Sequence, residues 1–382
     1  MAALRPVPVP SGPSALSVLT TVEAVLAGRE PAMLPVPADD EHQTRLLTTS
    51  LRAGEDIDDD VAVVVSTSGT TGTPKGAMLT AAALTASADA THRRLGGPGR
   101  WLLALPAHHI AGLQVLVRSV VAGRAPVAVS ARFDASELPA AVSAMGSGRR
   151  YASMVASQLD KALADPSASA ALAELDAILI GGGPMPGRIA ERAAAAGLSV
   201  LRTYGMSETA GGCVYDGVPL DGVRVRIDPD GRIALGGATL AKGYRNPPDP
   251  DPFAEPGWYV TDDIGALDDS GILRVLGRTD DAISTGGLTV FPHLVETALA
   301  SHPRVADCAV FGVPDDSLGQ RVVAAVVAVD GYPAPTLSEL RTHVKTTLAP
   351  TAAPRQVHIV DELPRRGIGK VDRRRLAALF AD

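Results

Sequence analysis

The chain has 382 residues, enough for two or three domains with a substantial core. Hydrophobic residues make up 46% and the formal net charge is −7, which argues against general disorder and against a surface that tracks nucleic-acid backbones. The two cysteines, Cys213 and Cys308, cannot build a disulfide framework, so a reducing, cytoplasmic setting is expected. No apolar run reaches the roughly 18 residues of a membrane span.

After a Pro-rich start with weak patterning, strands and helices alternate from residue 61 to residue 201. This alternation favours a parallel sheet with crossover helices. The expected strands are 61–65, 101–105, 177–180 and 199–202, and the expected helices are 80–95, 110–121 and 186–196.

The pattern changes twice in the second half of the chain. Residues 212–276 contain short segments that alternate at period two, which is typical of antiparallel β structure. Residues 293–380 read as a compact α+β unit. We therefore predict an α/β protein. Its large N-terminal domain (1–279) has parallel α/β sheets plus an antiparallel β part and is shortened at its start, and a small, mobile α+β domain (280–382) follows.

A segment rich in glycine and hydroxyl side chains follows the first buried strand. It reads Ser-Thr-Ser-Gly-Thr-Thr-Gly-Thr-Pro-Lys-Gly over residues 66–76. Glycines let backbone N–H groups approach an anion, hydroxyls donate to phosphate oxygens and the lysine supplies charge. It is not a Walker A loop, which needs Gly-Lys-Ser/Thr. We predict a phosphate-binding loop rather than a surface linker, with these binding residues: Thr67, Ser68, Gly69, Thr70, Thr71, Gly72 and Lys75.

This loop and six later segments, in the same order, resemble the adenylate-forming superfamily of acyl-CoA synthetases, nonribosomal adenylation domains and luciferases. The later segments are Leu105–Leu113, Ile180–Pro184, Thr203–Thr209, Trp258–Asp263, Leu276–Ile283 and Leu363–Arg373. The resemblance implies the fold of that family. It also implies that a carboxylic acid reacts first with ATP and then with coenzyme A, with Mg²⁺ as cofactor.

The resemblance also implies where the nucleotide binds. Tyr204 would stack on adenine, the Ser207 hydroxyl would contact the α-phosphate, and Glu208 would hold Mg²⁺, an ion that prefers one or two carboxylates plus phosphate oxygens. The complete implied set is Gly181, Gly182, Gly183, Thr203, Tyr204, Gly205, Ser207, Asp263 for the ribose hydroxyls and Arg278 for ribose or α-phosphate. Asp262 departs from the family's glycine, a residue that could serve a positive φ there.

Three further residues acquire roles by the same resemblance. His109 falls on the position that gates the substrate carboxylate, Gly287 on a glycine of the pantetheine tunnel, and Lys370 on the catalytic lysine. Asp280 falls on the hinge about which the small domain rotates between the two half-reactions. Plain alternatives stay open for each group: local hydrogen bonds for the histidine pair, a capping role for Glu208, an exposed turn for Asp262 and Asp263, simple turns for the glycines, and an ordinary surface position for Lys370.

The implied activity is an ATP-dependent acid–CoA ligase. Residues 208–217 and the short chain look most like the o-succinylbenzoate–CoA ligases of menaquinone biosynthesis. The free carboxylate of such a substrate needs a donor or cation, and the candidates are Arg118, Arg202 and the hydroxyls near Ser207 and Thr209. A stand-alone enzyme that loads a carrier protein and a non-catalytic nucleotide sensor are the alternatives, and a homodimer is left open.

Overall fold

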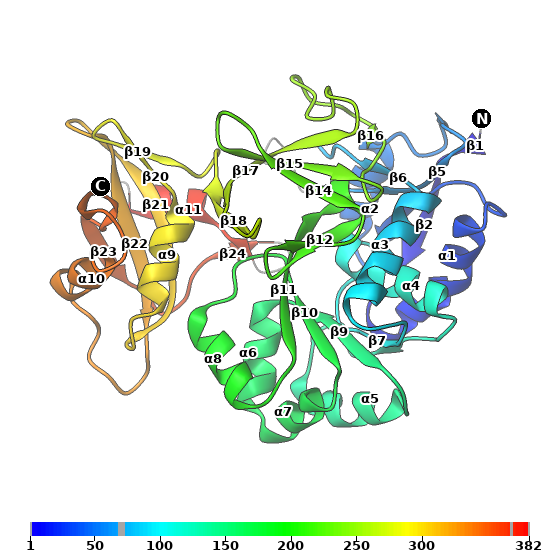
Figure 1. Cartoon of the computed structure of the whole chain (residues 1–382), viewed down its shortest axis with the longest axis horizontal. Helices are drawn as coiled ribbons and strands as arrows, with labels where there is room; N and C mark the ends of the chain where they lie inside the picture. The colour runs from blue at the N-terminus through cyan, green and yellow to red at the C-terminus, as the bar shows by residue number, and fades with distance from the viewer. Residues whose placement is uncertain (1, 68–72, 367–369, 381–382) are drawn as a thin grey trace.

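The computed structural model describes residues 2–67, 73–366 and 370–380. Figure 1 shows a larger body, coloured from blue to green, beside a smaller group of elements coloured from yellow to red. The two chain ends lie toward opposite ends of the long axis. None of the helices in the described ranges is long and apolar enough to cross a membrane.

A mixed sheet forms the centre of the larger body. Its order within the described residues is β13-β12-β11-β10-β9-β7-β8. The strands from β7 to β11 are parallel to their neighbours, and β12 and β13 turn back antiparallel. The bounds are β7 Arg100–Leu103, β8 Val127–Ala128, β9 Arg150–Met154, β10 Ala177–Ile180, β11 Val200–Met206, β12 Gly211–Tyr215 and β13 Val218–Pro219. The predicted parallel sheet with crossover helices is found here.

The strand predicted at 61–65 belongs to a second sheet, with the order β16-β6-β5-β3-β2 in the described chain. Its bounds are β2 Arg5–Val9, β3 Met33–Pro37, β5 Val61–Val65, β6 Ala77–Thr80 and β16 Gly243–Tyr244. Strand β6 runs antiparallel to β5, so the loop between them turns the chain back on itself. The weakly patterned start of the chain thus supplies two strands of a sheet.

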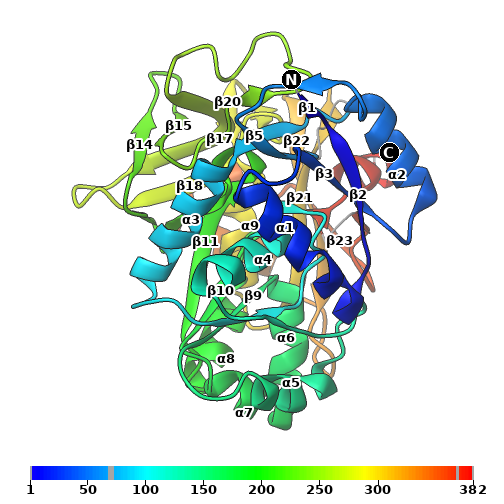
Figure 2. The ribbon, with the colours of Figure 1, turned by 90° about the vertical axis from the view of Figure 1, so that its right-hand side faces the viewer.

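Helices α1 (Leu19–Leu26), α3 (Ala81–Arg94) and α4 (Ile110–Ala122) lie between these two sheets, because one apolar cluster joins them to the facing strands of both. The cluster includes Val63, Leu84, Leu116 and the fully buried Trp101. The outer face of the larger sheet is covered by α5 Leu138–Ala144, α6 Ala156–Ala164, α7 Pro166–Ala173 and α8 Gly187–Ala195. Figure 2 shows these four helices together at one end of the molecule, and α2 (Glu41–Ser50) covers the smaller sheet.

The period-two pattern predicted antiparallel β structure, and an antiparallel sheet is found there, packed against β12. Its order within the described residues is β14-β15-β17-β18, with the bounds β14 Val223–Ile227, β15 Arg232–Gly237, β17 Trp258–Leu267 and β18 Leu273–Arg278. Trp258 begins β17 and lies beneath the guanidinium groups of Arg224 and Arg226, 4.7 and 4.4 Å from its ring centre. The strand that starts at Trp258 also contains Asp263.

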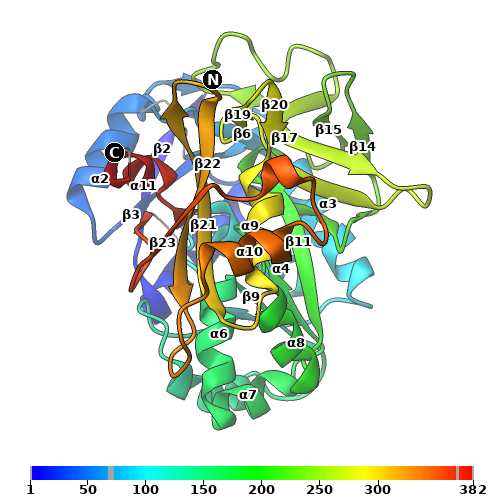
Figure 3. The same ribbon diagram turned by 90° about the vertical axis from the view of Figure 1, so that its left-hand side faces the viewer.

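The C-terminal elements form their own sheet with apolar clusters on both faces. The strands are β19 Ile283–Thr285, β20 Leu288–Val290, β21 Val305–Asp315, β22 Gly319–Ala328 and β23 Gln356–Ile359. Figure 3 shows α9 (Pro292–Ala300) and α10 (Leu337–Val344) on one face and α11 (Arg373–Leu379) on the other. Two short pairs complete the described elements: β1 Ala2–Ala3 with β4 Asp56–Ile57, and β24 Arg365–Arg366 with β25 Lys370–Val371. A domain boundary after residue 279 stays a prediction.

Candidate active site

The end of the predicted phosphate loop is held by the segment around β16. Asn246 donates from its backbone to the Lys75 carbonyl at 2.9 Å and from its side chain to the Pro74 carbonyl at 3.1 Å. The Lys75 ammonium lies 5.4 Å from the centre of the Tyr244 ring. Ser68, Gly69, Thr70, Thr71 and Gly72 lie outside the described residues.

Glu208 lies on a short 3-10 turn, η3 (Ser207–Thr209), and is buried. Its carboxylate accepts a hydrogen bond from the Tyr244 hydroxyl, and its backbone carbonyl accepts one from the Ala241 N–H at 2.8 Å. Burial, followed by the Glu208 charge, raises the pKa of Tyr244, so this phenol stays a donor. Tyr244 therefore contacts both Lys75, which was predicted to bind phosphate, and Glu208, which was predicted to bind Mg²⁺.

Asp263 is a buried carboxylate on β17 with two partners that come from different strands. Tyr204 on β11 donates its hydroxyl to Oδ2 at 2.7 Å, and Arg278 at the end of β18 approaches Oδ1 at 3.3 Å. Burial raises the pKa of Asp263, and the Tyr204 hydroxyl and Arg278 charge partly offset that effect. Three residues predicted for the nucleotide therefore meet directly.

Arg278 also binds Asp280 at 2.8 Å, the residue predicted to be the hinge. Burial opposes the charge of Arg278, but the carboxylates of Asp280, Asp263 and Asp262 more than offset it and raise the pKa of Arg278. Asp262 lies in the extended strand β17, not at a positive φ, and accepts from Arg232 at 3.2 Å. Aspartate therefore replaces the family's glycine there without backbone strain.

Glycines of the predicted nucleotide set permit close approaches between strands. A Cβ on Gly181 would lie 2.6 Å from the Thr203 hydroxyl, and one on Gly205 would lie 2.2 Å from the Gly211 carbonyl. Gly205 has φ +155 and lies at the register shift between β11 and β12. Gly182, by contrast, has φ +80, and a Cβ on Gly183 would meet open space. Close packing against neighbouring residues explains Gly181 and Gly205 without a ligand, and an adenine contact for this group stays a prediction.

His109 begins helix α4 as its N-cap residue, next to His108 with 4.3 Å between the ring centres. Burial, followed by the neighbouring His109, lowers the pKa of His108 to about 4, so His108 is neutral near pH 7. The first turn of α4 reaches the glutamate segment: a Cβ on Gly211 would lie 3.8 Å from Ile110 Cγ1. Ile110, the residue after His109, therefore lies close to Gly211, three residues after Glu208.

Other predicted residues are not drawn into this cluster by any described contact. Gly286 and Gly287 form the two-residue turn between β19 and β20, both at positive φ, which is the ordinary requirement of a tight hairpin. Lys370 pairs through its backbone with Arg366, and its side chain lies outside the described part of the chain. Roles for Gly287 in the thiol tunnel and for Lys370 in catalysis stay predictions.

The two arginines considered for a second carboxylate have other partners. Arg118 is buried over the Trp101 ring, 4.8 Å from its centre, and donates weakly to Ser153 and Tyr215. Arg202 is exposed and pairs with Asp216 at 3.3 Å. Thr209 donates to the carbonyls of Met206 and Gly211. None of these contacts identifies the residue that would bind a second carboxylate.

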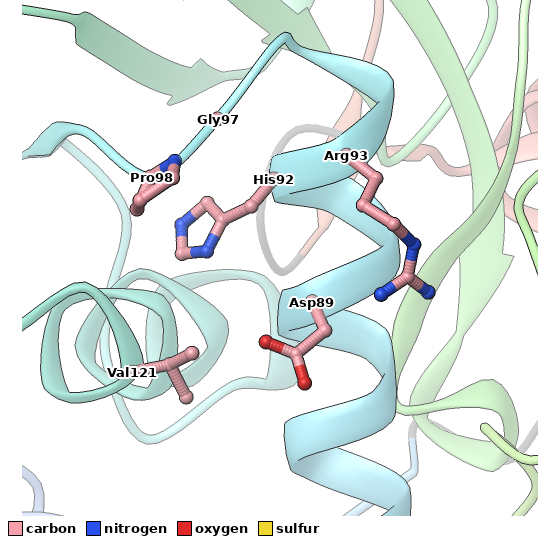
Figure 4. A pocket seen from close by; sticks show the side chains of 6 residues that line it. All are labelled: Asp89, His92, Arg93, Gly97, Pro98 and Val121. Carbon is pink, nitrogen blue, oxygen red and sulfur yellow. The ribbon is translucent and has the colours of Figure 1, made fainter.

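A pocket of about 220 Å³ lies elsewhere on the molecule, between α3, α4 and residues 97–98. Figure 4 shows Asp89, His92 and Arg93 extending from one helix and Val121 from its neighbour. Its lining includes none of the predicted site residues, so we assign it no part in the activity.

The donors present suit a nucleotide accompanied by Mg²⁺. Thr67 Oγ1 is buried and has no hydrogen-bond partner among the described residues, as a hydroxyl reserved for a phosphate oxygen would be. No group of three or more metal-binding side chains occurs in the described ranges. A single glutamate is nevertheless sufficient where phosphate oxygens complete the coordination.

Tyr244 is the main site residue that the sequence analysis missed. It links Lys75 to Glu208 and lies 3.3 Å from the Tyr259 hydroxyl. Its only signal in the sequence is rarity, since aromatic residues make up 3% of the chain. No spacing relative to residues 66–76 or 203–209 could have indicated it.

Comparison with known families gives two matches. The family model described as AMP-binding enzyme matches residues 11–245, and the family model described as AMP-binding enzyme C-terminal domain matches residues 294–370. The second match lies within the α+β unit expected at 280–382.

Among curated proteins, the probable 2-succinylbenzoate–CoA ligase of Mycobacterium tuberculosis (strain ATCC 25618 / H37Rv) is 66% identical over 382 residues, 99% of each chain. The 2-succinylbenzoate–CoA ligase of Geobacillus sp. (strain WCH70) is 35% identical and matches 84% of this chain and 70% of that one.

Among solved structures, o-succinylbenzoate CoA synthetase from Bacillus subtilis in complex with the acyl-adenylate intermediate has a TM-score of 0.77 at 26% identity, covering 98% of this chain and 88% of that one. The same enzyme in complex with ATP and a magnesium ion has a TM-score of 0.76 at 27% identity, covering 98% and 89%. The fold, the contacts among the predicted site residues and these similarities lead to one conclusion: the chain belongs to the AMP-binding enzyme family.

Proposed function

We propose that the protein is an AMP-forming acid–CoA ligase that converts 2-succinylbenzoate to 2-succinylbenzoyl-CoA in menaquinone biosynthesis. The observation that supports the substrate most strongly is the 66% identity over 99% of both chains to a probable 2-succinylbenzoate–CoA ligase. The chemistry is supported by two groups of contacts, one that joins Lys75 and Glu208 through Tyr244 and one that joins Tyr204 and Arg278 through Asp263.

Asp263 binds the ribose in this proposal. A carboxylate has about four acceptor positions, and its described partners, Tyr204 and Arg278, use one oxygen each. Two positions therefore remain for the two ribose hydroxyls. The Tyr204 ring then lies against the adenine while its hydroxyl keeps Asp263 oriented.

The first half-reaction joins the acid to AMP. The substrate carboxylate attacks the α-phosphorus of ATP, pyrophosphate leaves, and a mixed anhydride forms. Two anions must approach each other, so positive charge and donors have to be in place beforehand. Thr67 and Lys75 would donate to the phosphates, Glu208 would hold Mg²⁺, and Lys370 would supply positive charge to the reacting oxygens. Bound Mg²⁺ would neutralise triphosphate charge.

The second half-reaction releases AMP. The thiol of coenzyme A loses its proton and its sulfur attacks the acyl carbonyl, the bond between the acyl carbon and the phosphate oxygen breaks, and AMP departs as the thioester forms. The small domain rotates at Asp280, withdraws Lys370 and brings Gly287 to the pantetheine chain. Arg278 lies between the ribose carboxylate and the hinge carboxylate, and therefore next to the moving boundary.

A panel of aromatic and aliphatic acids tests this function. Purified protein with ATP, Mg²⁺ and coenzyme A is expected to release pyrophosphate and consume thiol with 2-succinylbenzoate, and to do so poorly with benzoate or succinate. Asp263→Asn is the matched inactive control, because it keeps the shape but removes the charge and replaces one acceptor oxygen with an NH₂ donor. Thiol consumption with another acid and none with 2-succinylbenzoate would contradict the substrate.

The same assay separates the remaining alternatives. Pyrophosphate release without thiol consumption would indicate an enzyme that loads a carrier protein, and binding of ATP without either product would indicate a nucleotide sensor. A cytoplasmic location and a homodimer belong to the proposal and are checked by cell fractionation and by light scattering.

A further inference from the structure

Two buried side chains from different helices hold one backbone carbonyl beside the candidate metal residue. Ser87 on α3 donates its hydroxyl to the Ala210 carbonyl at 3.0 Å, and Gln114 on α4 donates its amide nitrogen to the same oxygen at 2.7 Å. Both donors are almost completely excluded from solvent, at 0% and 1% exposure. A carbonyl oxygen only accepts, so the Gln114 nitrogen must face it.

The backbone at Ala210 needs this support. It adopts the left-handed conformation, φ 52° and ψ 37°, which is unfavourable for an L-residue other than glycine. Ala210 is also fully buried, so its carbonyl would carry an uncompensated desolvation cost if it were left without a donor. The two hydrogen bonds therefore stabilise a turn that the local sequence does not favour.

This turn is the direct continuation of the segment that contains Glu208. Ala210 ends the 3-10 turn at 207–209, and Gly211 follows at φ +95 against the side chain of Gln114, which a Cβ there would approach to 3.2 Å. Upstream, the Glu208 carbonyl is held by Ala241. The glutamate is thus fixed on one side by Ala241 and on the other by the Ser87–Gln114 pair.

We propose that Ser87 and Gln114 are positioning residues: by holding the Ala210 carbonyl, they direct the Glu208 carboxylate toward the metal-bound triphosphate. This inference rests on the proposed function for the role of Glu208. Gln114 also lies one helical turn after Ile110, so the same contact fixes the start of α4, where His109 lies, relative to the glutamate.

The test removes each donor and measures nucleotide binding rather than turnover. The variants are Ser87→Ala, Gln114→Met and the double variant, and the matched control is Ser119→Ala. Ser119 is equally buried on α4, but its hydroxyl donates only to Val115 of the same helix. Calorimetry gives the affinity for a non-hydrolysable ATP analogue with and without Mg²⁺, and thermal unfolding gives the stability of each variant.

Each single variant is expected to lower the Mg²⁺-dependent gain in affinity about fivefold, the value of one neutral hydrogen bond. The loss of Mg²⁺-dependent affinity in the double variant should exceed the product of the two single-variant losses, because the Ala210 carbonyl then has neither donor. Ser119→Ala should match the unaltered protein. A drop in stability with an unchanged Mg²⁺-dependent gain would overturn the inference, since it would leave both residues a purely structural role.

Gln114→Glu keeps the shape and supplies a check if Gln114→Met does not fold. A buried glutamate donates to the Ala210 carbonyl only when protonated, so the defect should be large at alkaline pH and shrink toward acid pH. A defect independent of pH would count against the inference. Failure of the unaltered protein to release pyrophosphate with every acid would reject the proposed function, whereas the binding results would still decide the role of the pair.

Discussion

At the scale of single residues, Asp263 is buried and its carboxylate contacts Tyr204 and Arg278. In the proposed function the same carboxylate must also accept hydrogen bonds from the ribose. Burial raises the pKa of Asp263 above the ordinary 3.8. As the pH is lowered, protonation of this carboxylate should therefore weaken nucleotide binding already at a pH above 3.8. The Tyr204 hydroxyl donates to the charged form and opposes this shift. The ionised state that accepts the ribose hydroxyls therefore depends on a tyrosine.

Tyr204→Phe tests this dependence while it keeps the aromatic ring. Loss of the donated hydrogen bond destabilises the carboxylate, raises the pKa of Asp263 further and moves the acid limb of ATP binding to higher pH. The affinity for ATP measured across a pH series reports the limb directly. A limb that stays in place in Tyr204→Phe would show that another group controls binding in acid.

A second residue makes stability depend on pH. His92 is buried, accepts a hydrogen bond from the Trp101 indole at 3.3 Å, and has its pKa lowered from 6.5 to about 4, by burial first and then by the charge of Arg118. Its lowered pKa means that the unfolded chain binds more protons between these two values. Stability is therefore present above pH 6.5 and is lost as the pH falls toward 4.

From about pH 7 to about pH 5 this histidine alone should remove about 2 kcal/mol from the free energy of unfolding. Urea unfolding followed by circular dichroism at several pH values measures the loss, and His92→Gln should flatten it over the same range. An equally steep loss in His92→Gln would assign the effect to other groups.

At the scale of elements, the start of α4 depends on one glycine. A Cβ on Gly112 would lie 2.3 Å from the Pro106 carbonyl, so the helix can approach residues 105–106 only without a side chain there. That approach sets the position of His109, three residues earlier. The helix and the loop at residues 105–106 thus form one unit with the candidate acid gate.

Gly112→Ala is expected to lower the free energy of unfolding by about 1–3 kcal/mol, as overpacking does. It should also raise the KM for the acid more than the KM for ATP. Gly187→Ala is the matched control, since it adds the same methyl group in the first turn of α8, where nothing lies within 4 Å. Equal effects on both KM values would argue that α4 does not position the acid.

The elements also show how far the sequence could go. The strands at 61–65 and 177–180 and the helices at 80–95 and 110–121 were predicted within one or two residues, because their apolar pattern is strong. Strand β6 and the pairing of 61–65 in a separate sheet were missed, since pairing partners leave no trace in local pattern. Tyr244 was missed for the same reason: contact across 36 positions brings it to Glu208.

At the scale of the whole molecule, one lysine on the small C-terminal unit is proposed to act in only one half-reaction. Polar contacts at the boundary include Arg278 with Asp280 and Arg188 with the Ala306 carbonyl, at 2.8 Å each, and Gly277 packs closely against Phe291. Polar contacts of this kind can exchange partners when two units move relative to each other. We propose that the rotation occurs at this boundary.

Lys370→Ala should lower pyrophosphate formation about 10²-fold, the usual result of removing one preorganised charge. It should keep most thioester formation from supplied acyl-adenylate and coenzyme A. Single-turnover measurements of the two half-reactions provide the comparison. Equal losses in both would be incompatible with a lysine that withdraws.

The placement of the two tryptophans has a practical consequence for following these events. Trp101 is sealed in the core between the sheets, whereas Trp258 lies half-buried under two arginines at the beginning of the strand that contains Asp263. Their emission spectra should therefore differ in colour and in access to an iodide quencher. Replacing either one with phenylalanine leaves a single-site fluorescent reporter, one for melting of the interior and one for events at the ribose strand.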